Sequence, residues 1–319
     1  MNNEDMFVLT KGQRKAIKEL LDKGRRDVPT FLEEGASEIQ YVPIDDGELR
    51  VFHHKPEKQT TKRPIVFIPG YVAAPSIWVD FHIPHQDFGE YYYLETREKR
   101  SSKIKRTRQT TMTINRTAYD VGVEIKNLGL ANKDYVLASS SYGGAVILDG
   151  LINKYFDPPT TFVHGPIVKW IWDKSINDVL LRIVPMFLLN AIRIPIAYIF
   201  TAGMKNKINR RRMIEFARGL EPWKFKRCTL ENNRFNIFED LKKIKNEIFI
   251  NTGPLDRYHP RLDYYNYAKE IPRGRFLFMN TADEDRQLLA GIIGTEFIKV
   301  AKNDGLPESL KQFEIKIQR

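Results

Sequence analysis

Residues 134–147 read DYVLASSSYGGAVI and contain the residue types that a nucleophilic serine requires. Residues 135–138 form a short apolar run typical of a buried strand, after which very small residues lead into an apolar, helix-like stretch. A strand, a sharp turn and a helix are the setting of a nucleophile elbow. Ser141 stands at its centre, with Ser139 and Gly143 as the flanking small residues. The pattern predicts Ser141 as a nucleophile, although an ordinary strand-to-helix loop explains the small residues equally well.

An attacking serine also needs a donor for the negative charge that develops on the substrate oxygen. The backbone N–H of Tyr142, the residue after Ser141, is expected to face that oxygen. Serine is a poor nucleophile until a base removes its proton, so the position of a base decides whether Ser141 can react.

The elements around this stretch indicate an α/β protein with a mostly parallel sheet, because strands alternate with helices. An Asp45-Asp46-Gly47 turn between two short strands predicts an antiparallel hairpin at one edge. Further strands are expected at residues 64–70, 91–96, 135–138, 160–166, 247–251 and 275–279, and helices at 11–26, 113–128, 260–271 and 284–301. Residues 167–233 interrupt the alternation with helix-like sequence that is rich in large apolar and aromatic residues.

Composition limits the class of protein. The chain has 319 residues, 42% of them hydrophobic, which is enough to bury a sizeable core. A single cysteine, Cys228, excludes an internal disulfide, and the first ten residues lack a signal-peptide pattern, so we expect a cytoplasmic protein. The net charge of +11 can attract nucleic acid, anionic lipid or acidic substrates, but an ordinary solvated surface with excess lysine is the simpler explanation. We expect no nucleic acid as a partner, because no nucleic-acid-binding signature is present.

Residues 179–200 are apolar, but Arg182 and Arg193 interrupt them and the longest uncharged stretch is too short to span a bilayer. We therefore expect buried or amphipathic helices there. Most of their apolar side chains are expected to form a core of their own, and some to line a ligand pocket. Together with the basic residues 205–212, this segment also resembles a surface that could sit on anionic lipid.

The chain resembles the α/β-hydrolase superfamily over about residues 39–300. Pro69-Gly70-Tyr71 is similar to the family's His-Gly-x, with proline in place of histidine, which implies the Tyr71 N–H as a second oxyanion donor beside that of Tyr142. Residues 94–102, LETREKRSS, resemble the family's D-x-R-G-x-G-x-S segment without its glycines. Residues 249–260, FINTGPLDRYHP, resemble its acid loop, which implies Asp256 as the triad acid.

The resemblance also implies a histidine after the last strand, where this chain has an acidic run with Asp283 near the expected position. Loss of a triad histidine costs on the order of 10⁶ in kcat, so an active enzyme needs another base. The candidates are His164, at the C-terminal end of strand 160–166, and His259, close to Asp256. Each also has an ordinary explanation, a packed histidine for the first and an exposed loop residue for the second.

We expect an α/β-hydrolase fold with flanking helices: an N-terminal helical extension over 1–35, a core over 36–166 and 236–319, and a helical cap inserted over 167–235. One predicted function is a serine hydrolase of carboxylic ester or related acyl bonds in a lipophilic substrate. The other is a catalytically degenerate hydrolase that binds a ligand or acts as a scaffold.

The expected partners are a small acyl substrate or lipophilic ligand and an anionic membrane surface, and the oligomeric state stays open. We expect no redox cofactor or nucleotide, because neither phosphate-binding glycine motif occurs. No metal is expected either, since His82 and His85 lack an obvious carboxylate partner.

Overall fold

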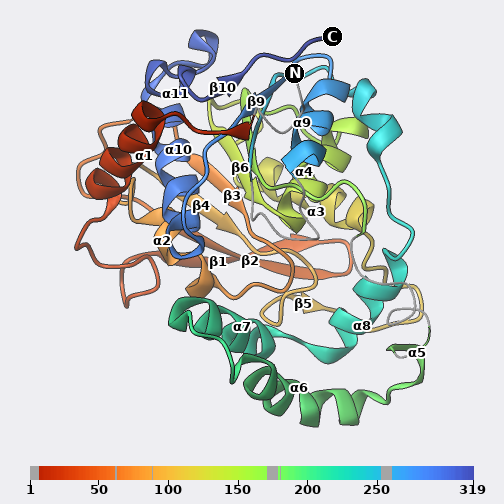
Figure 1. Cartoon of the computed structure of the whole chain (residues 1–319). Coiled ribbons are helices and arrows are strands. Elements are labelled where there is room, and N and C mark those ends of the chain that lie inside the picture. Colours follow the sequence, from red (N-terminus) through yellow and green to blue (C-terminus); the bar gives the residue numbers. More distant parts are fainter. Residues whose placement is uncertain (1–6, 62, 88, 171–178, 180, 253–260) are drawn as a thin grey trace.

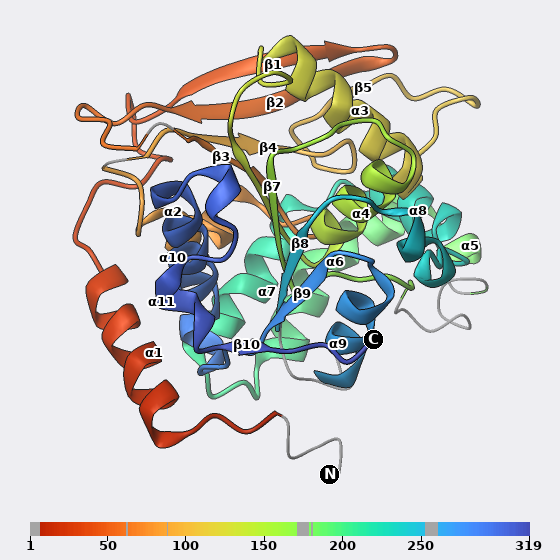
Figure 2. The ribbon, with the colours of Figure 1, turned by 90° about the horizontal axis from the view of Figure 1, so that it is seen from above.

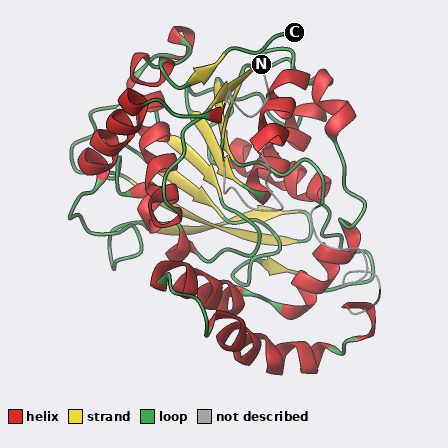
Figure 3. Cartoon of the chain, in the orientation of Figure 1, coloured by secondary structure: helices red, strands yellow, loops and turns green. Residues whose placement is uncertain are grey.

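The structure is a computed structural model that describes residues 7–61, 63–87, 89–170, 179, 181–252 and 261–319. A central sheet is covered by helices, and a group of helices extends from one end of it (Figure 1). Figure 3 shows the strands enclosed between the two helical layers. This arrangement confirms the predicted α/β class.

The sheet runs in the order β1-β2-β4-β3-β6-β7-β8-β9-β10, with β5 paired to β2. The strands from β4 to β9 in this order are parallel, whereas β1, β2 and β10 are antiparallel to their neighbours. The predicted antiparallel hairpin at one edge is therefore confirmed. The strands are β1 (Glu38–Ile44), β2 (Gly47–His54), β3 (Ile65–Ile68), β4 (Tyr91–Leu94), β5 (Lys103–Ile104), β6 (Val136–Ser140), β7 (Thr160–His164), β8 (Ile248–Asn251), β9 (Gly274–Leu277) and β10 (Glu314–Ile315).

Helices cover both faces of the parallel strands, which is why β3, β4, β6, β7 and β8 are buried along their whole length. Figure 2 shows α1, α2, α10 and α11 on one side of the sheet and α3, α4 and α9 on the other. The helices of the core are α1 (Lys11–Gly24), α2 (Val79–His82), α3 (Ile114–Asn127), α4 (Tyr142–Ile152), α9 (Arg261–Glu270), α10 (Arg286–Lys299) and α11 (Glu308–Lys311). Short 3-10 helices are η2 (Pro75–Ile77), η4 (Phe238–Lys243), η5 (Asp283–Asp285) and η6 (Lys302–Asp304).

The predicted cap, residues 167–235, leaves the sheet after β7 and returns to it before β8. It contains α5 (Leu181–Ile183), α6 (Met186–Thr201), α7 (Lys207–Gly219) and α8 (Pro222–Glu231). Helix α7 packs against η2 and η5 of the core, and α6 packs on α7. Helix α6 is therefore the outermost part of this group in Figure 1. Among the described residues, no helix is both long and apolar enough to cross a membrane.

One arrangement is not evident from the sequence, and one expectation about local structure is wrong. Arg97 and Lys99 belong to a run of basic residues with a single opposing carboxylate, yet both side chains are buried. Arg97 is paired with Asp46 at 2.6 Å and with Asp120, so burial of its charge is compensated. The apolar side chains of α6 were expected to form a core, but many of them are exposed, among them Phe187, Leu188, Ile196, Tyr198, Ile199 and Phe200.

Candidate active site

Ser141 lies between the end of β6 at Ser140 and the start of α4 at Tyr142. Its φ of 52° and ψ of −113° lie outside the conformations that a non-glycine residue ordinarily adopts. Hydrogen bonds over-determine this strained turn: the Ser141 N–H donates to the carbonyl of His164 at 3.1 Å, and its own carbonyl accepts from Gly144 at 3.0 Å. The backbone at Ser141 thus has the sharp, strained turn that the elbow pattern predicts.

The small residues after Ser141 are required by close packing. A Cβ atom on Gly143 would lie 2.2 Å from the carbonyl oxygen of Ile68, and one on Gly144 would lie 2.6 Å from Cβ of Pro166. The first turn of α4 therefore touches the backbone at the end of β3 and the chain after β7. Only glycine permits this approach, which sets the position of the elbow relative to the neighbouring strands.

A cavity of about 400 Å³ opens beside the elbow. Its lining brings together the elbow, the turn after β3, the end of β7 and one side of α7, including Gly70, Tyr71, Ser141, Tyr142, His164, Arg212, Met213 and Phe216. Ile77, Trp78, Ile167 and Trp170 add to a lining that is mostly apolar. A mostly apolar cavity with a few polar groups is the usual form of a small-molecule site.

The turn after β3, at Gly70, Tyr71 and Val72, is held by buried charges. Val72 has a φ of 52°, which is unusual for a β-branched residue. Its N–H donates to Oε1 of Glu98 at 3.4 Å. Lys99 Nζ lies 2.8 Å from the same oxygen and also donates to the carbonyl of Gly70. The segment that resembles the family's D-x-R-G-x-G-x-S stretch thus fixes the turn that carries the predicted donor Tyr71.

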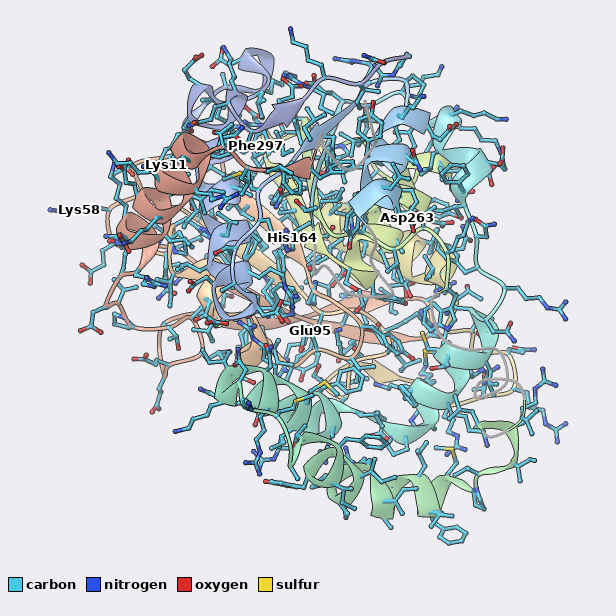
Figure 4. The ribbon with its side chains drawn as sticks, in the orientation of Figure 1. Lys11, Lys58, Glu95, His164, Asp263 and Phe297 are labelled. Carbon is cyan, nitrogen blue, oxygen red and sulfur yellow. The ribbon has the colours of Figure 1, made fainter. Side chains whose placement is uncertain are left out.

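His164 lies at the end of β7, is almost completely buried and contributes to the lining of the cavity. Figure 4 shows it near the centre of the molecule. The structure therefore places Ser141, Tyr71, Tyr142 and His164 around one space. The sheet register pairs His164 with Asn251, the last residue of β8.

The Asn251 amide lies against the imidazole, with 3.1 Å between Asn251 Nδ2 and His164 Nδ1. An amide nitrogen that donates to Nδ1 leaves the proton of neutral His164 on Nε2, whereas an amide oxygen there would keep the proton on Nδ1. Asn251 therefore selects the tautomer of His164. Sequence reasoning missed this residue, although it ends a predicted strand at the same sheet edge, where α/β proteins bind ligands.

The other predicted site residues lie elsewhere. Asp256 and His259 fall outside the described residues. His82 and His85 are buried against aromatic rings such as those of Phe31 and Tyr91 and do not contribute to the lining of this cavity. Burial lowers the pKa of His82 well below its usual value and that of His85 to about 3, so both are neutral. In the described part of the chain, no group of three or more His, Cys, Asp or Glu side chains is arranged to hold a metal ion.

Asp283, at the position expected for the triad histidine, lies in η5 with 58% of its side chain exposed. It contacts the cap: its Oδ2 accepts from Asn209 Nδ2 at 3.3 Å, and its carbonyl accepts from Arg212 Nη1 at 3.0 Å. Burial and the neighbouring Arg286 guanidinium lower the pKa of Arg212. This segment of the core therefore holds α7, the helix that lines the cavity from the cap side.

No protein-family model matches the sequence, and a comparison with curated proteins finds no similar one. Solved structures, in contrast, share the fold. An esterase from Exiguobacterium antarcticum superposes with a TM-score of 0.65 at 15% identity, over 82% of this chain and 98% of that one. A hydrolase from Pseudomonas aeruginosa has a TM-score of 0.63 at 11% identity, again over 82% and 98% of the two chains.

A thermophilic esterase from Thermogutta terrifontis has a TM-score of 0.58 at 15% identity, over 75% of this chain and 88% of that one. The strand order, the flanking helices and these superpositions agree with one another. The chain therefore has the α/β-hydrolase fold.

Proposed function

We propose that the protein is a serine hydrolase of carboxylic esters or related acyl bonds. The observation that carries this proposal is the strained turn at Ser141, which contributes to the lining of a mostly apolar cavity together with His164. Residues held in rarely adopted backbone conformations cluster at functional sites, because surrounding structure has to maintain them. The esterases and hydrolases among the structural neighbours support the same class of reaction.

In the proposed mechanism, Ser141 Oγ attacks the acyl carbonyl carbon while His164 takes the serine proton. The backbone N–H groups of Tyr71 and Tyr142 stabilise the oxyanion, and collapse of the intermediate expels the alcohol, which receives the proton from His164. Water then attacks the acyl-enzyme and gives a proton to His164; the Ser141 ester bond breaks to release the carboxylic acid, and His164 returns that proton to Ser141 Oγ. The proposed mechanism requires Asn251 to present its amide oxygen to Nδ1, in place of the amide nitrogen that lies there at 3.1 Å, so that the proton of neutral His164 is on Nδ1 and Nε2 is free to act as the base.

Asp256 and His259 are retained as a proposed acid and an alternative base from the family resemblance. His164 contributes to the lining of the cavity together with Ser141, whereas Asp256 and His259 fall outside the described residues. We therefore assign the role of base to His164 in this proposal. The variants His164→Gln and His259→Gln separate the two assignments.

The proposed substrate is lipophilic, because apolar side chains from both the core and α7 line the cavity, among them Trp78, Met213 and Phe216. Such a substrate would be met at an anionic membrane surface within the cytoplasm. No cofactor enters the proposed reaction, because attack, oxyanion stabilisation and proton transfer are all assigned to groups of the chain itself.

A second candidate function is ligand binding without catalysis. The observation that favours it concerns Asp283, at the position where the family resemblance implies a histidine. Its side chain and carbonyl contact Asn209 and Arg212 of the cap. A carboxylate with an ordinary pKa near 4 is a weak base for serine activation. In this alternative the cavity keeps a lipophilic ligand, and Ser141 contributes only a polar contact.

The deciding experiment is hydrolysis of p-nitrophenyl esters of increasing acyl length by the purified chain, by Ser141→Ala and by the control Ser309→Ala. Ser309 donates a hydrogen bond to Glu296 on α10 and is far from the elbow in the sequence, so its substitution is expected to leave activity unchanged. Ser141→Ala is expected to lose activity by a factor on the order of 10⁵ or more. Folded wild-type protein without activity would favour the binding protein, and a Ser141→Ala variant as active as an active wild type would contradict Ser141 as the nucleophile.

A further inference from the structure

The cap contains a long stretch without acidic residues. Residues 179–214 include seven lysines and arginines and no aspartate or glutamate, whereas the whole chain has 40 acidic residues among 319. A run of 36 residues at the average frequency would contain about four or five acids. Five of the seven basic residues, at 205–212, lie between the end of α6 and the first half of α7, so positive charge is concentrated there.

Large apolar side chains are exposed on the same segment. Phe187 is 77% exposed, Phe200 is 75% exposed, and Ile183 and Ile199 are each 73% exposed. Phe187 lies near the start of α6 (Met186–Thr201), and Ile199 and Phe200 lie near its end, so exposed apolar side chains occur at both ends of the helix. Helix α7 packs on α6 from the core side, and in Figure 1 α6 lies at the outer edge of the molecule. We call this exposed apolar side of α6, with Ile183 before it and Phe200 at its end, the outer cap face.

Basic residues follow the outer cap face along the chain. Lys205 lies just after α6, and Lys207, Arg210 and Arg211 lie in α7; all four are exposed, and Arg211 lines a hollow that α7 forms with core residues such as Asp80. None of the four forms an ion pair with a residue that the structure describes, in contrast to Arg212, which lies 3.5 Å from Asp80. An apolar face that lysine and arginine follow along the chain has the chemistry of a helix that lies in a membrane interface.

The charge of this surface discriminates between occupants. A second copy of the chain would bring two basic, acid-free surfaces together, and like charges across an interface oppose association. An anionic bilayer supplies both components that the face lacks, an acyl layer for the aromatic and aliphatic side chains and phosphate groups for the cations. Since α6 is too short to span a bilayer, binding would be confined to one leaflet surface.

We propose that the outer cap face docks the protein on an anionic membrane surface. Phe187, Ile199 and Phe200 enter the boundary between headgroups and acyl chains, while Lys205, Lys207 and Arg210 contact lipid phosphates. Because α7 contributes Arg212, Met213 and Phe216 to the cavity at Ser141, docking places lipid on the far side of the helix that closes that cavity. The inference deepens the proposed function by naming where a lipophilic substrate is met, but membrane binding does not require a reactive Ser141.

The test is flotation of the full chain with vesicles of phosphatidylcholine alone and of phosphatidylcholine mixed with phosphatidylglycerol. Wild type is expected to float with the anionic vesicles, to float less at high salt and to remain unbound with the neutral ones. Ser141→Ala is included so that failure of catalysis and failure of docking give different results, and it is expected to bind like wild type.

Two cap variants separate the apolar and charged components. Phe187→Ser with Phe200→Ser is expected to weaken binding about tenfold or more, and its control is Val8→Ser with Ile39→Ser, two exposed apolar residues outside the cap. Lys205→Gln, Lys207→Gln and Arg210→Gln together are expected to weaken it by a similar factor. Their control removes the same charge from α1, with Lys11→Gln, Lys15→Gln and Lys18→Gln, which are exposed and far from α6 in Figure 1.

Thermal unfolding of each variant establishes that it is folded before binding is measured. Absence of wild-type protein from the anionic vesicle fraction would overturn the proposal, as would equal weakening by the cap variants and their α1 and Val8/Ile39 controls. Sedimentation in the absence of lipid tests whether a second copy of the chain covers the outer cap face instead. A wild-type dimer that becomes a monomer in the Phe187/Phe200 variant would assign the face to a second copy and overturn membrane docking.

Discussion

The turn that carries Ser141 and the segment that follows β9 both lie at the edge of the sheet where the cavity opens, but they use polar residues differently. Beside the elbow, Glu98 and Lys99 are buried, paired with each other, and hydrogen-bonded to the backbone of the Gly70–Val72 turn. After β9, Asp283 is exposed and contacts Asn209 and Arg212 of the cap. Buried charges therefore hold the backbone of the Gly70–Val72 turn beside the elbow. After β9, an exposed carboxylate and a backbone carbonyl hold helix α7.

This difference shows which half of the site has the rigidity that catalysis needs. A buried ion pair holds its partners in one geometry because breaking it leaves an uncompensated charge, whereas an exposed pair contributes little. The side with Ser141 and the Gly70–Val72 turn is therefore built for precise positioning. The η5 side, where the family resemblance implies a histidine, contacts α7 through Asp283 and so helps to hold this helix beside the cavity.

The largest expected effect on stability follows from removal of the buried positive charge of Lys99. Lys99→Met leaves Glu98 buried without its charge partner, and we expect the free energy of unfolding to fall by about 3–5 kcal/mol. Urea unfolding measures the change. Lys103→Met is the control, because Lys103 forms an exposed pair with Glu48 and is expected to cost at most about 1 kcal/mol. Equal effects of the two variants would contradict the comparison.

A clash at the elbow is expected to rank second. Gly143→Ala brings a methyl group to within 2.2 Å of the Ile68 carbonyl oxygen, so the backbone must move. We expect a loss of about 1–3 kcal/mol in stability together with most of the hydrolytic activity. Gly203→Ala serves as the control, since a Cβ atom there would meet nothing within 4 Å. An active, fully stable Gly143→Ala protein would show that the elbow does not need this close approach.

The elbow side also predicts a pH dependence through Glu124 of α3. Its side chain is buried, neither oxygen has a hydrogen-bond partner among the described residues, and burial raises its pKa well above the usual value. The folded state then keeps a proton that the unfolded chain releases above about pH 4.5, so stability falls as pH rises toward the folded pKa.

The variant Glu124→Gln removes this titration. It is expected to match wild type at about pH 4 and to be the more stable protein at about pH 8, by about 1.4 kcal/mol for each unit by which the pKa is raised. Urea unfolding of both proteins across this range makes the comparison. A difference between them that does not change with pH would contradict the assignment of a buried, protonated Glu124.

The smallest effect is expected on the η5 side. Asp283→Ala removes an exposed carboxylate that contacts Asn209 and Arg286, and the cost in unfolding free energy should stay below about 1 kcal/mol. The KM of the proposed hydrolysis should rise, because α7 lines the cavity, while kcat changes little. Asp240→Ala, which removes another exposed carboxylate near Lys243, is the control for stability. A large fall in kcat would place Asp283 in the chemistry.

The sequence was informative where a local pattern has one structural solution. The apolar runs predicted the buried strands, and the small residues around Ser141 predicted the sharp turn before α4. The two-residue strands β5 and β10 were missed because they are too short to show periodicity. The burial of Arg97 and Lys99 was missed because a basic run has the composition of a solvated surface, and their partners Asp46 and Gly70 are distant in the chain.

The contact between His164 and Asn251 was also beyond the sequence. The two residues are separated by the whole cap and meet only because β7 and β8 pair in the sheet. Either residue alone has an ordinary explanation at the end of a strand, and only the register shows that they touch. Likewise, no local pattern indicated that the residues near Asp283 would contact α7, since this contact depends on where the cap packs.

The most direct test of the account is covalent labelling with a fluorophosphonate probe, located by peptide mass spectrometry, in wild type, Ser141→Ala, His164→Gln and His259→Gln. The account predicts labelling of wild type at Ser141, none in Ser141→Ala, a rate lower by on the order of 10³ or more in folded His164→Gln, and little change in His259→Gln. Absence of labelling in folded wild-type protein, or labelling of His164→Gln at the wild-type rate, would contradict a Ser141 nucleophile activated by His164.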